Sequence, residues 1–188
     1  MNPVHVLGIS GSLRKASHNT GLLRAALGIL PEGLTLEIAG IDSLPLFNSD
    51  LETPGEPAPV TELKSRIAAA DALLIATPEY NYSVTGALKN AIDWASRPLK
   101  TAPLNAKPLA MMGAGGAQGT VRAQMHLRQI LLHNGALILP KPELYVYRSR
   151  EKFDQAGELT DDHTRESLRT LLEALGSWTR RMRGEPWR

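Results

Sequence analysis

Short apolar runs alternate with segments of helical periodicity along almost the whole chain. A short apolar run bounded by turn residues is typical of a buried strand. This pattern predicts strands over residues 4–9, 34–38, 72–76, 109–112 and 136–139. Apolar residues that recur with the period of a helix predict helices over residues 19–30, 60–70, 86–96, 120–134 and 160–183.

The alternation of strands and helices predicts an α/β fold with a parallel sheet. Residues 1–188 fit a single domain, and the flavodoxin-like strand order 2-1-3-4-5 is the commonest arrangement for five strands with helices on both faces. We therefore expect a flavodoxin-like three-layer sandwich, with the strand at 34–38 at an edge. In such sheets ligands bind beyond the carboxyl ends of the strands, so the loops after strands one, three and four are the candidate sites.

The loop after the first strand gathers polar and basic residues at the start of a helix. A helix N-terminus presents unpaired N–H groups and the positive end of the helix dipole, which together favour an anion. Hydroxyl and guanidinium groups add donors for phosphate oxygens. We predict a phosphate-binding loop made by Ser10, Ser12, Leu13, Arg14, Ser17, His18 and Asn19.

A simple capping loop is the alternative interpretation of this segment, because Ser17 or Asn19 could cap the helix. Capping accounts for one polar residue and leaves the others unexplained. The spacing excludes more specific motifs. No Gly-Lys is followed by Ser or Thr, Gly8 and Gly11 do not form G-x-G-x-x-G, and Ser10 lacks the G-x-S-x-G elbow of serine hydrolases.

The residues that follow the third strand predict a tight polar turn with two tyrosines. Such a turn could wrap a flat heteroaromatic ring, although tyrosines in ordinary turns give the same pattern. Glu79 could be a general base, but no histidine or paired carboxylate nearby in the sequence supports that role. The candidate ring-binding residues are Pro78, Glu79, Tyr80, Asn81, Tyr82 and Ser83.

The loop after the fourth strand, residues 113–119, is rich in glycine. Glycine lets a backbone approach a ligand closely, and a lone glycine-rich loop is weak evidence of a site. Here the glycine-rich loop is the third candidate loop at the same end of one predicted sheet. The predicted site rests on this convergence of three loops. We add Gly113, Gly115 and Gly116 to the predicted cofactor-binding residues.

Composition narrows the class of protein. The net charge of +2 is too small an excess to favour nucleic acid, and no apolar run is long enough to span a membrane. The absence of cysteine and of a signal-peptide pattern leads us to expect a soluble cytoplasmic protein. No metal site is expected, since His126 and His133 are seven residues apart, roughly 10.5 Å along a helix.

Three motifs resemble those of the NAD(P)H-dependent FMN reductases of the flavodoxin-like superfamily, which include bacterial quinone and chromate reductases. The resemblance covers residues 4–175. The motif G-S-x-R-x-x-S-x-N is met by Gly11, Ser12, Arg14, Ser17 and Asn19. The motif P-E-Y-N-x-S is met by Pro78, Glu79, Tyr80, Asn81 and Ser83. The adjoining G-x-L-K-N-x-x-D-W is met by Gly86, Leu88, Lys89, Asn90, Asp93 and Trp94.

The resemblance implies bound FMN, with NADPH or NADH as co-substrate and a small-molecule electron acceptor such as a quinone, free flavin, an azo compound or chromate. It places the FMN phosphate on Ser12, Arg14, Ser17 and Asn19, and the isoalloxazine ring against residues 79–82 with Ser83 nearby. The chemistry would occur at flavin N5 without a catalytic side chain. It also implies a homodimer or homotetramer, to which the helix at 120–134 is a candidate contributor. The glycines at 113, 115 and 116 replace the Ser or Thr that family members often carry.

Two other functions fit the same fold. A flavodoxin-type electron carrier has no substrate of its own, but such carriers are typically acidic and this chain is not. A nucleotide-binding module without enzymatic activity is the second alternative, because a fold alone does not determine a function.

Overall fold

A computed structural model describes residues 3–52 and 55–184 of the chain. Its central sheet is parallel, with the order β2-β1-β3-β4-β5. The predicted flavodoxin-like order is therefore confirmed, with the second strand at the edge. The strands are β1 (Val4–Ser10), β2 (Leu34–Ala39), β3 (Ala72–Ala76), β4 (Pro108–Ala114) and β5 (Leu137–Ile138).

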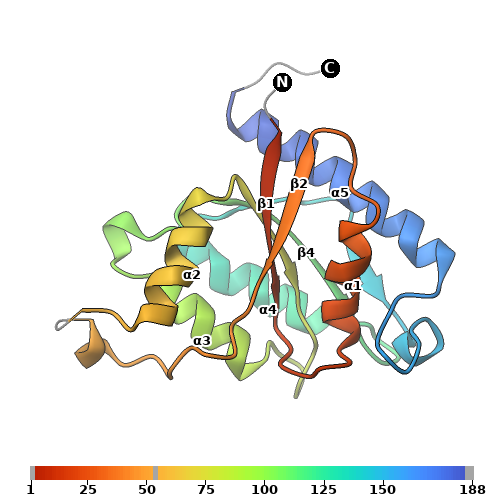
Figure 1. Cartoon of the computed structure of the whole chain (residues 1–188), viewed down its shortest axis with the longest axis horizontal. Coiled ribbons are helices and arrows are strands. Elements are labelled where there is room, and N and C mark those ends of the chain that lie inside the picture. Colours follow the sequence, from red (N-terminus) through yellow and green to blue (C-terminus); the bar gives the residue numbers. More distant parts are fainter. Residues whose placement is uncertain (1–2, 53–54, 185–188) are drawn as a thin grey trace.

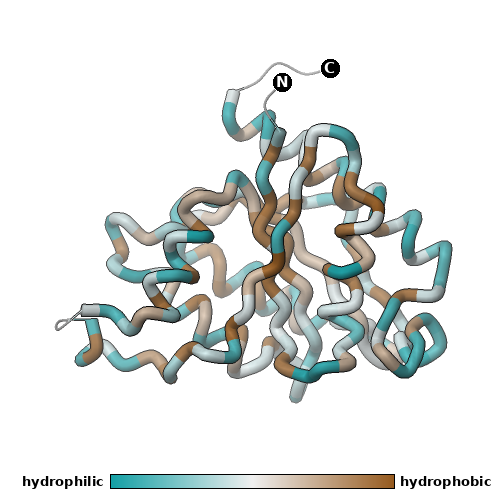
Figure 2. Tube along the Cα trace, viewed as in Figure 1, coloured by the Kyte–Doolittle hydropathy of each residue, from teal (hydrophilic) through white to brown (hydrophobic). Residues whose placement is uncertain are grey.

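Helices cover both faces of the sheet (Figure 1). One face packs against α1 (His18–Leu27) and α5 (Asp162–Met182). The opposite face packs against α2 (Ala58–Ala69), α3 (Gly86–Ala95) and α4 (Val121–Leu131). Alternate residues of the inner strands point to opposite faces and pack into the hydrophobic core on each face. In β1, Val6 packs on the side of α1 and α5, and Leu7 packs on the opposite side. Figure 2 shows the resulting apolar stretch along β1 in the middle of the molecule.

The fifth strand is interrupted, which the sequence pattern did not predict. β5 pairs with the start of β4, and a further strand, β6 (Leu144–Val146), pairs with the end of β4. Pro140 and Pro142 lie between the two pieces, and proline cannot donate to a sheet ladder. β4 is also longer than predicted, since Gly113 and Ala114 belong to it and the glycine-rich loop begins at Gly115.

Two of the predicted helices end earlier than expected. α1 ends at Leu27, where Gly28 caps the helix, and Leu27 is exposed instead of lying in the core. α4 ends at Leu131 and continues as a short 3-10 turn to Asn134. Gly135 then ends the segment in the left-handed conformation that glycine adopts readily.

The proline-rich loop between β2 and α2 is anchored on α3. The Pro45 carbonyl accepts hydrogen bonds from Trp94 Nε1 at 2.8 Å and Asn90 Nδ2 at 2.9 Å. Phe47 packs its ring edge against Trp94 with centroids 4.9 Å apart. Trp94 is therefore fully buried beneath the loop. Residues 53 and 54 of this loop lie outside the described residues.

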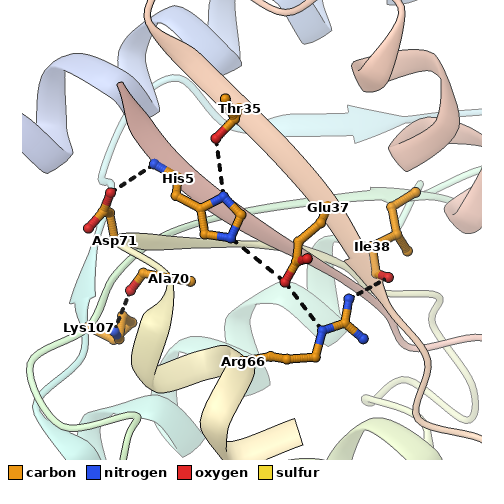
Figure 3. A network of polar contacts seen from close by, with 8 residues as sticks. All are labelled: His5, Thr35, Glu37, Ile38, Arg66, Ala70, Asp71 and Lys107. Atoms are coloured by element: carbon orange, nitrogen blue, oxygen red, sulfur yellow. Dashed lines mark hydrogen bonds and ion pairs between the residues drawn. The ribbon is translucent and has the colours of Figure 1, made fainter. Parts of the chain in front are cut away.

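At the amino ends of the strands the polar contacts are structural (Figure 3). The Asp71 carboxylate accepts a hydrogen bond from the His5 backbone N–H at 2.8 Å, and Lys107 Nζ donates to the Ala70 carbonyl at 2.6 Å. Burial lowers the pKa of Lys107 below its usual value. Arg66 joins Glu37 to the Ile38 carbonyl beside the edge strand. The contacts of Asp71 and Lys107 fasten strands and helices together at the end opposite the three predicted loops.

Candidate functional site

The three predicted loops begin side by side because the carboxyl ends of their strands are in register. Ser10 pairs with Ala76, and Ala76 pairs with Met112. The Gly11 N–H donates to the Ala76 carbonyl at 2.8 Å, and the Thr77 N–H donates to the Met112 carbonyl at 2.9 Å. The loops therefore leave the sheet from one row, as the sequence predicted.

A cavity of about 520 Å³ lies among these loops. Of the predicted residues, it is lined by Ser12, Arg14, Ser17, His18, Asn19, Pro78, Glu79, Tyr80, Gly115 and Gly116. The other predicted residues do not line it: Ser10, Leu13, Asn81, Tyr82, Ser83 and Gly113. The structure thus gathers residues from all three loops around one space.

The first loop turns around the start of α1 and leaves donors facing the cavity. Ser17 is the N-cap, and its hydroxyl accepts from the Thr20 N–H at 3.4 Å. The N–H groups of His18 and Asn19 have no acceptor within the helix, because of helix geometry. Ser10 lies behind the loop, with its Oγ 2.8 Å from Thr20 Oγ1 and accepting from the Ser12 N–H at 3.2 Å. Ser10 therefore shapes the loop without facing the cavity.

Asn19 joins the first loop to the third. Its side chain is buried, and Nδ2 donates to the Ala114 carbonyl while Oδ1 accepts from the Ala114 N–H, both at 2.9 Å. Both ends of the amide are thereby used by the protein. Asn19 contributes its position and its backbone N–H to the cavity, and its side chain holds the end of β4.

His18 lies between the first loop and the segment that follows β6. Its ring stacks on Phe153 with centroids 4.5 Å apart, and Nδ1 is 2.9 Å from Ser149 Oγ. Burial, and then the nearby charges of Arg14 and Arg150, lower the pKa of His18 below its usual value. The imidazole is therefore neutral at neutral pH, and the positive charge near it comes from Arg14 and Arg150.

The second loop is a two-residue hairpin. Tyr80 and Ser83 exchange two backbone hydrogen bonds of 3.0 Å, and the residues between them, Asn81 and Tyr82, have φ values of 50° and 64°. Positive φ at both central positions is what a type I′ turn requires. Tyr80 is 50% exposed and Tyr82 is 66% exposed. The hairpin thus presents two aromatic rings to its surroundings on a fixed backbone.

Glu79 anchors this hairpin to α4. Its Oε2 accepts from the backbone N–H groups of Arg122 at 3.0 Å and Ala123 at 3.2 Å, and Oε1 accepts from Arg122 Nε at 2.7 Å. The first N–H groups of a helix lack internal partners, so this carboxylate caps α4 and complements its dipole. Arg122 also lies over the Tyr82 ring, 3.8 Å from its centroid. The bonds of Glu79 are those of an anchor for the hairpin.

Replacing Glu79 with glutamine is expected to destabilise the protein without removing a catalytic group. In the glutamine side chain an NH₂ group, which can only donate, replaces one of the two carboxylate oxygens. Either Arg122 Nε or the N–H groups of α4 therefore lose their acceptor. We expect the free energy of unfolding to fall by about 1.5–3 kcal/mol. With FMN saturating, stopped-flow reduction by NADPH should slow by less than about tenfold.

Glu151→Gln is the matched control, because Glu151 also lines the cavity but is exposed. It should change neither stability nor the reduction rate appreciably. A loss of about a thousandfold in Glu79→Gln with FMN still bound would instead mark its carboxylate as catalytic.

Two of the three predicted glycines are required by packing. Gly113 is buried at the end of β4, where an added Cβ would overlap the Thr77 carbonyl oxygen and Thr120 Oγ1. A Cβ on Gly115 would overlap the Gly119 carbonyl oxygen, whereas Gly116 has open space around it. Of the three predicted glycines, only Gly115 and Gly116 line the cavity.

Sequence reasoning missed the segment after β6, which forms another wall of the cavity. Arg148, Ser149, Arg150 and Glu151 all line it. The available signal was a short apolar run, residues 144–146, followed by two arginines. That run is too short, and too close to Pro140 and Pro142, to be recognised as a strand from its pattern.

A second cavity, of about 890 Å³, lies on the other side of the hairpin between α3 and α4. Ser83 lines this second cavity, as do Lys89, His126 and His133. It is larger, but it has no helix N-terminus with free donors, and the one arginine that lines it, Arg97, is paired with Glu52. The smaller cavity is the one at which the start of α1 and three arginines meet.

Among residues 3–52 and 55–184, no group of three or more His, Cys, Asp or Glu side chains could hold a metal ion. Within the same ranges, no helix is both long enough and apolar enough to cross a membrane.

Comparison with known families shows to which family the chain belongs. Residues 4–150 match the family described as NADPH-dependent FMN reductase. The chain belongs to this family. It is 50% identical over 182 residues to an NAD(P)H-dependent FMN reductase of Pseudomonas aeruginosa, covering 96% of this chain and 98% of that protein. It is 44% identical to an NAD(P)H:quinone oxidoreductase of Solanum tuberosum, covering 97% of this chain and 96% of that one.

A solved structure from the same class extends the likeness to three dimensions. FerB, a flavoenzyme NAD(P)H:(acceptor) oxidoreductase from Paracoccus denitrificans, matches with a TM-score of 0.84 and 35% identity. The match covers 95% of this chain and 98% of FerB. The family membership and the flavodoxin-like fold inferred from the sequence are both confirmed.

Proposed function

We propose that the chain oxidises NAD(P)H and reduces a quinone, with FMN bound in the 520 Å³ cavity. The observation that carries this proposal is the convergence of a donor-rich helix N-terminus, an aromatic hairpin and a glycine loop on that one space. Several relatives named as quinone reductases support the choice of acceptor, including one from Escherichia coli at 40% identity. Free flavin, azo compounds and chromate remain alternative acceptors.

The donor set of the cavity fits FMN. The hydroxyls of Ser12 and Ser17, the Arg14 guanidinium and the first N–H groups of α1 are suited to a phosphate monoester. Tyr80 and the open backbone at Gly116 offer flat and unhindered surfaces for a ring. We propose that the single flavodoxin-like domain supplies the whole binding site.

FMN, when bound, supplies the chemistry of accepting and passing on a hydride, so the protein's part is binding and orientation. Ser12, Arg14 and Ser17 would hold the phosphate, while Ser10 and Asn19 fix the loop around it. The 79–83 hairpin would hold the ring, with Glu79 fixing the hairpin to α4. Leu13, exposed beside Arg14, would cover the outer side of the loop.

We also propose that the protein is cytoplasmic, where its reductant NAD(P)H is found, and that it is a homodimer or homotetramer, because the site loops expose Leu13, Tyr80 and Tyr82. On α4, Met125 is 54% exposed whereas Leu131 is fully buried, so Met125 is the better candidate for a subunit contact. Sedimentation equilibrium of the purified protein tests the oligomeric state.

Steady-state kinetics separates this proposal from its two alternatives. Under anaerobic conditions the pure protein with bound FMN should turn over NADPH repeatedly only when a quinone such as benzoquinone is added, with ping-pong kinetics. An electron carrier would bind FMN but show no NADPH oxidation without a separate reductase. A nucleotide-binding module would neither retain FMN nor turn over NADPH, and either result would contradict the proposal.

A further inference from the structure

The segment that follows β6 is fixed against two loops of the proposed FMN site. The backbone N–H groups of Arg148 and Ser149 donate to the carbonyls of Gly116 and Gly115, each at 2.9 Å. Ser149 Oγ lies 2.9 Å from His18 Nδ1, at the first residue of α1. The segment is therefore held over the start of α1 from both sides, and its arginines have a defined place relative to the first loop.

Positive charge exceeds negative charge around this space, because three arginines line the cavity with two carboxylates, of which Glu79 is already paired with Arg122. Arg14 and Arg150 both line the cavity, and the charges of both act on the His18 ring. Arg148 lines the same cavity. In the part of the chain that the structure describes, none of these three guanidinium groups forms an ion pair with a carboxylate. Most other arginines there do, namely Arg24, Arg66, Arg97, Arg122, Arg128, Arg165 and Arg183.

Such a cluster at a helix N-terminus is arranged for a ligand of high negative charge. Like charges gathered around a dipole of the same sign repel one another until an anion enters. A phosphate monoester carries nearly two charges and three terminal oxygens, which is more than one arginine can satisfy. A guanidinium group can donate two parallel hydrogen bonds to such an anion.

We propose that Arg150 binds the 5′-phosphate of FMN together with Arg14, so that two guanidinium groups from different segments of the chain donate to the phosphate. Arg14 belongs to the loop after β1, and Arg150 to the 3-10 turn after β6. This inference rests on the proposed placement of FMN in the 520 Å³ cavity. It makes Arg150 a determinant of the preference for FMN over riboflavin, which has the same ring but no phosphate.

Titration of the apo-protein with both flavins tests this assignment. We expect Arg150→Ala to weaken FMN binding about tenfold and to leave riboflavin affinity within about twofold, as for loss of a hydrogen bond to a charged group at an exposed position. Added salt should reduce the difference between wild type and variant for FMN, because exposed charges are screened. Arg169→Ala, on α5 and outside the cavity lining, is the matched control and should bind both flavins as wild type does.

Three results would overturn the inference while leaving FMN binding itself intact. Arg150→Ala could bind FMN as tightly as wild type. It could weaken FMN and riboflavin equally, as a structural role would. It could raise the KM for NADPH with FMN affinity unchanged, which would assign Arg150 to the nicotinamide nucleotide. Arg150→Lys separates charge from geometry and should recover part of the FMN affinity. A wild-type protein that binds neither flavin would instead contradict the proposed function.

Discussion

Replacing Asn81 with proline is expected to abolish the retention of FMN during purification. Asn81 has a φ of 50°, whereas the proline ring holds φ near −65°, so the hairpin cannot keep its path. The two hydrogen bonds between Tyr80 and Ser83 depend on that path. We expect FMN affinity to fall by at least about a hundredfold, or about 2.7 kcal/mol, while the sheet remains folded.

The matched control for this prediction is Asn81→Gly. Glycine adopts positive φ readily, so the turn keeps its shape although the side chain is lost. The glycine variant should retain FMN close to one per chain, measured as flavin absorbance per polypeptide after gel filtration. If both variants lose FMN equally, the Asn81 side chain is required instead of the turn conformation. If the proline variant keeps its FMN, the hairpin does not hold the ring.

The second large effect is expected for Gly113→Ala, and it is an effect on folding. Gly113 is buried at the end of β4, and the new Cβ would overlap the Thr77 backbone carbonyl and the Thr120 hydroxyl. A backbone atom cannot move aside as the end of a flexible side chain can. We expect the free energy of unfolding, measured by urea denaturation, to fall by about 3 kcal/mol or more.

Gly116→Ala gives the comparison, since a Cβ there meets nothing within 4 Å and the residue is exposed. Its free energy of unfolding should stay within about 0.5 kcal/mol of wild type. Any effect of Gly116→Ala should therefore appear in flavin affinity alone. Equal stability of the two variants would contradict the packing described for the third loop.

The sheet and the place of the site could be predicted because both depend on local patterns. Buried strands such as 72–76 are short and almost entirely apolar, and each is followed by a loop whose residues are unusual for a simple connection. A parallel sheet brings the ends of its strands together, so the three loops had to meet once the strand order was right.

What could not be predicted depends on contacts between distant parts of the chain. Asn19 was assigned to phosphate binding, and nothing near it in sequence indicates that its amide bonds to Ala114, 95 residues away. The capping of α4 by Glu79 spans 43 residues. Arg150 reaches the start of α1 only because β6 returns the chain to the end of β4. Local periodicity carries no information on such pairings.

The visible spectrum of the purified protein, recorded anaerobically before and after adding NADPH, tests the central claim most directly. The account predicts the absorbance of one oxidised FMN per chain, its bleaching by one equivalent of NADPH, and its return when a quinone is added. The flavin released by heating should be FMN. A colourless protein that takes up no FMN, a stoichiometric yield of FAD, or a bound FMN that NADPH does not bleach would contradict it.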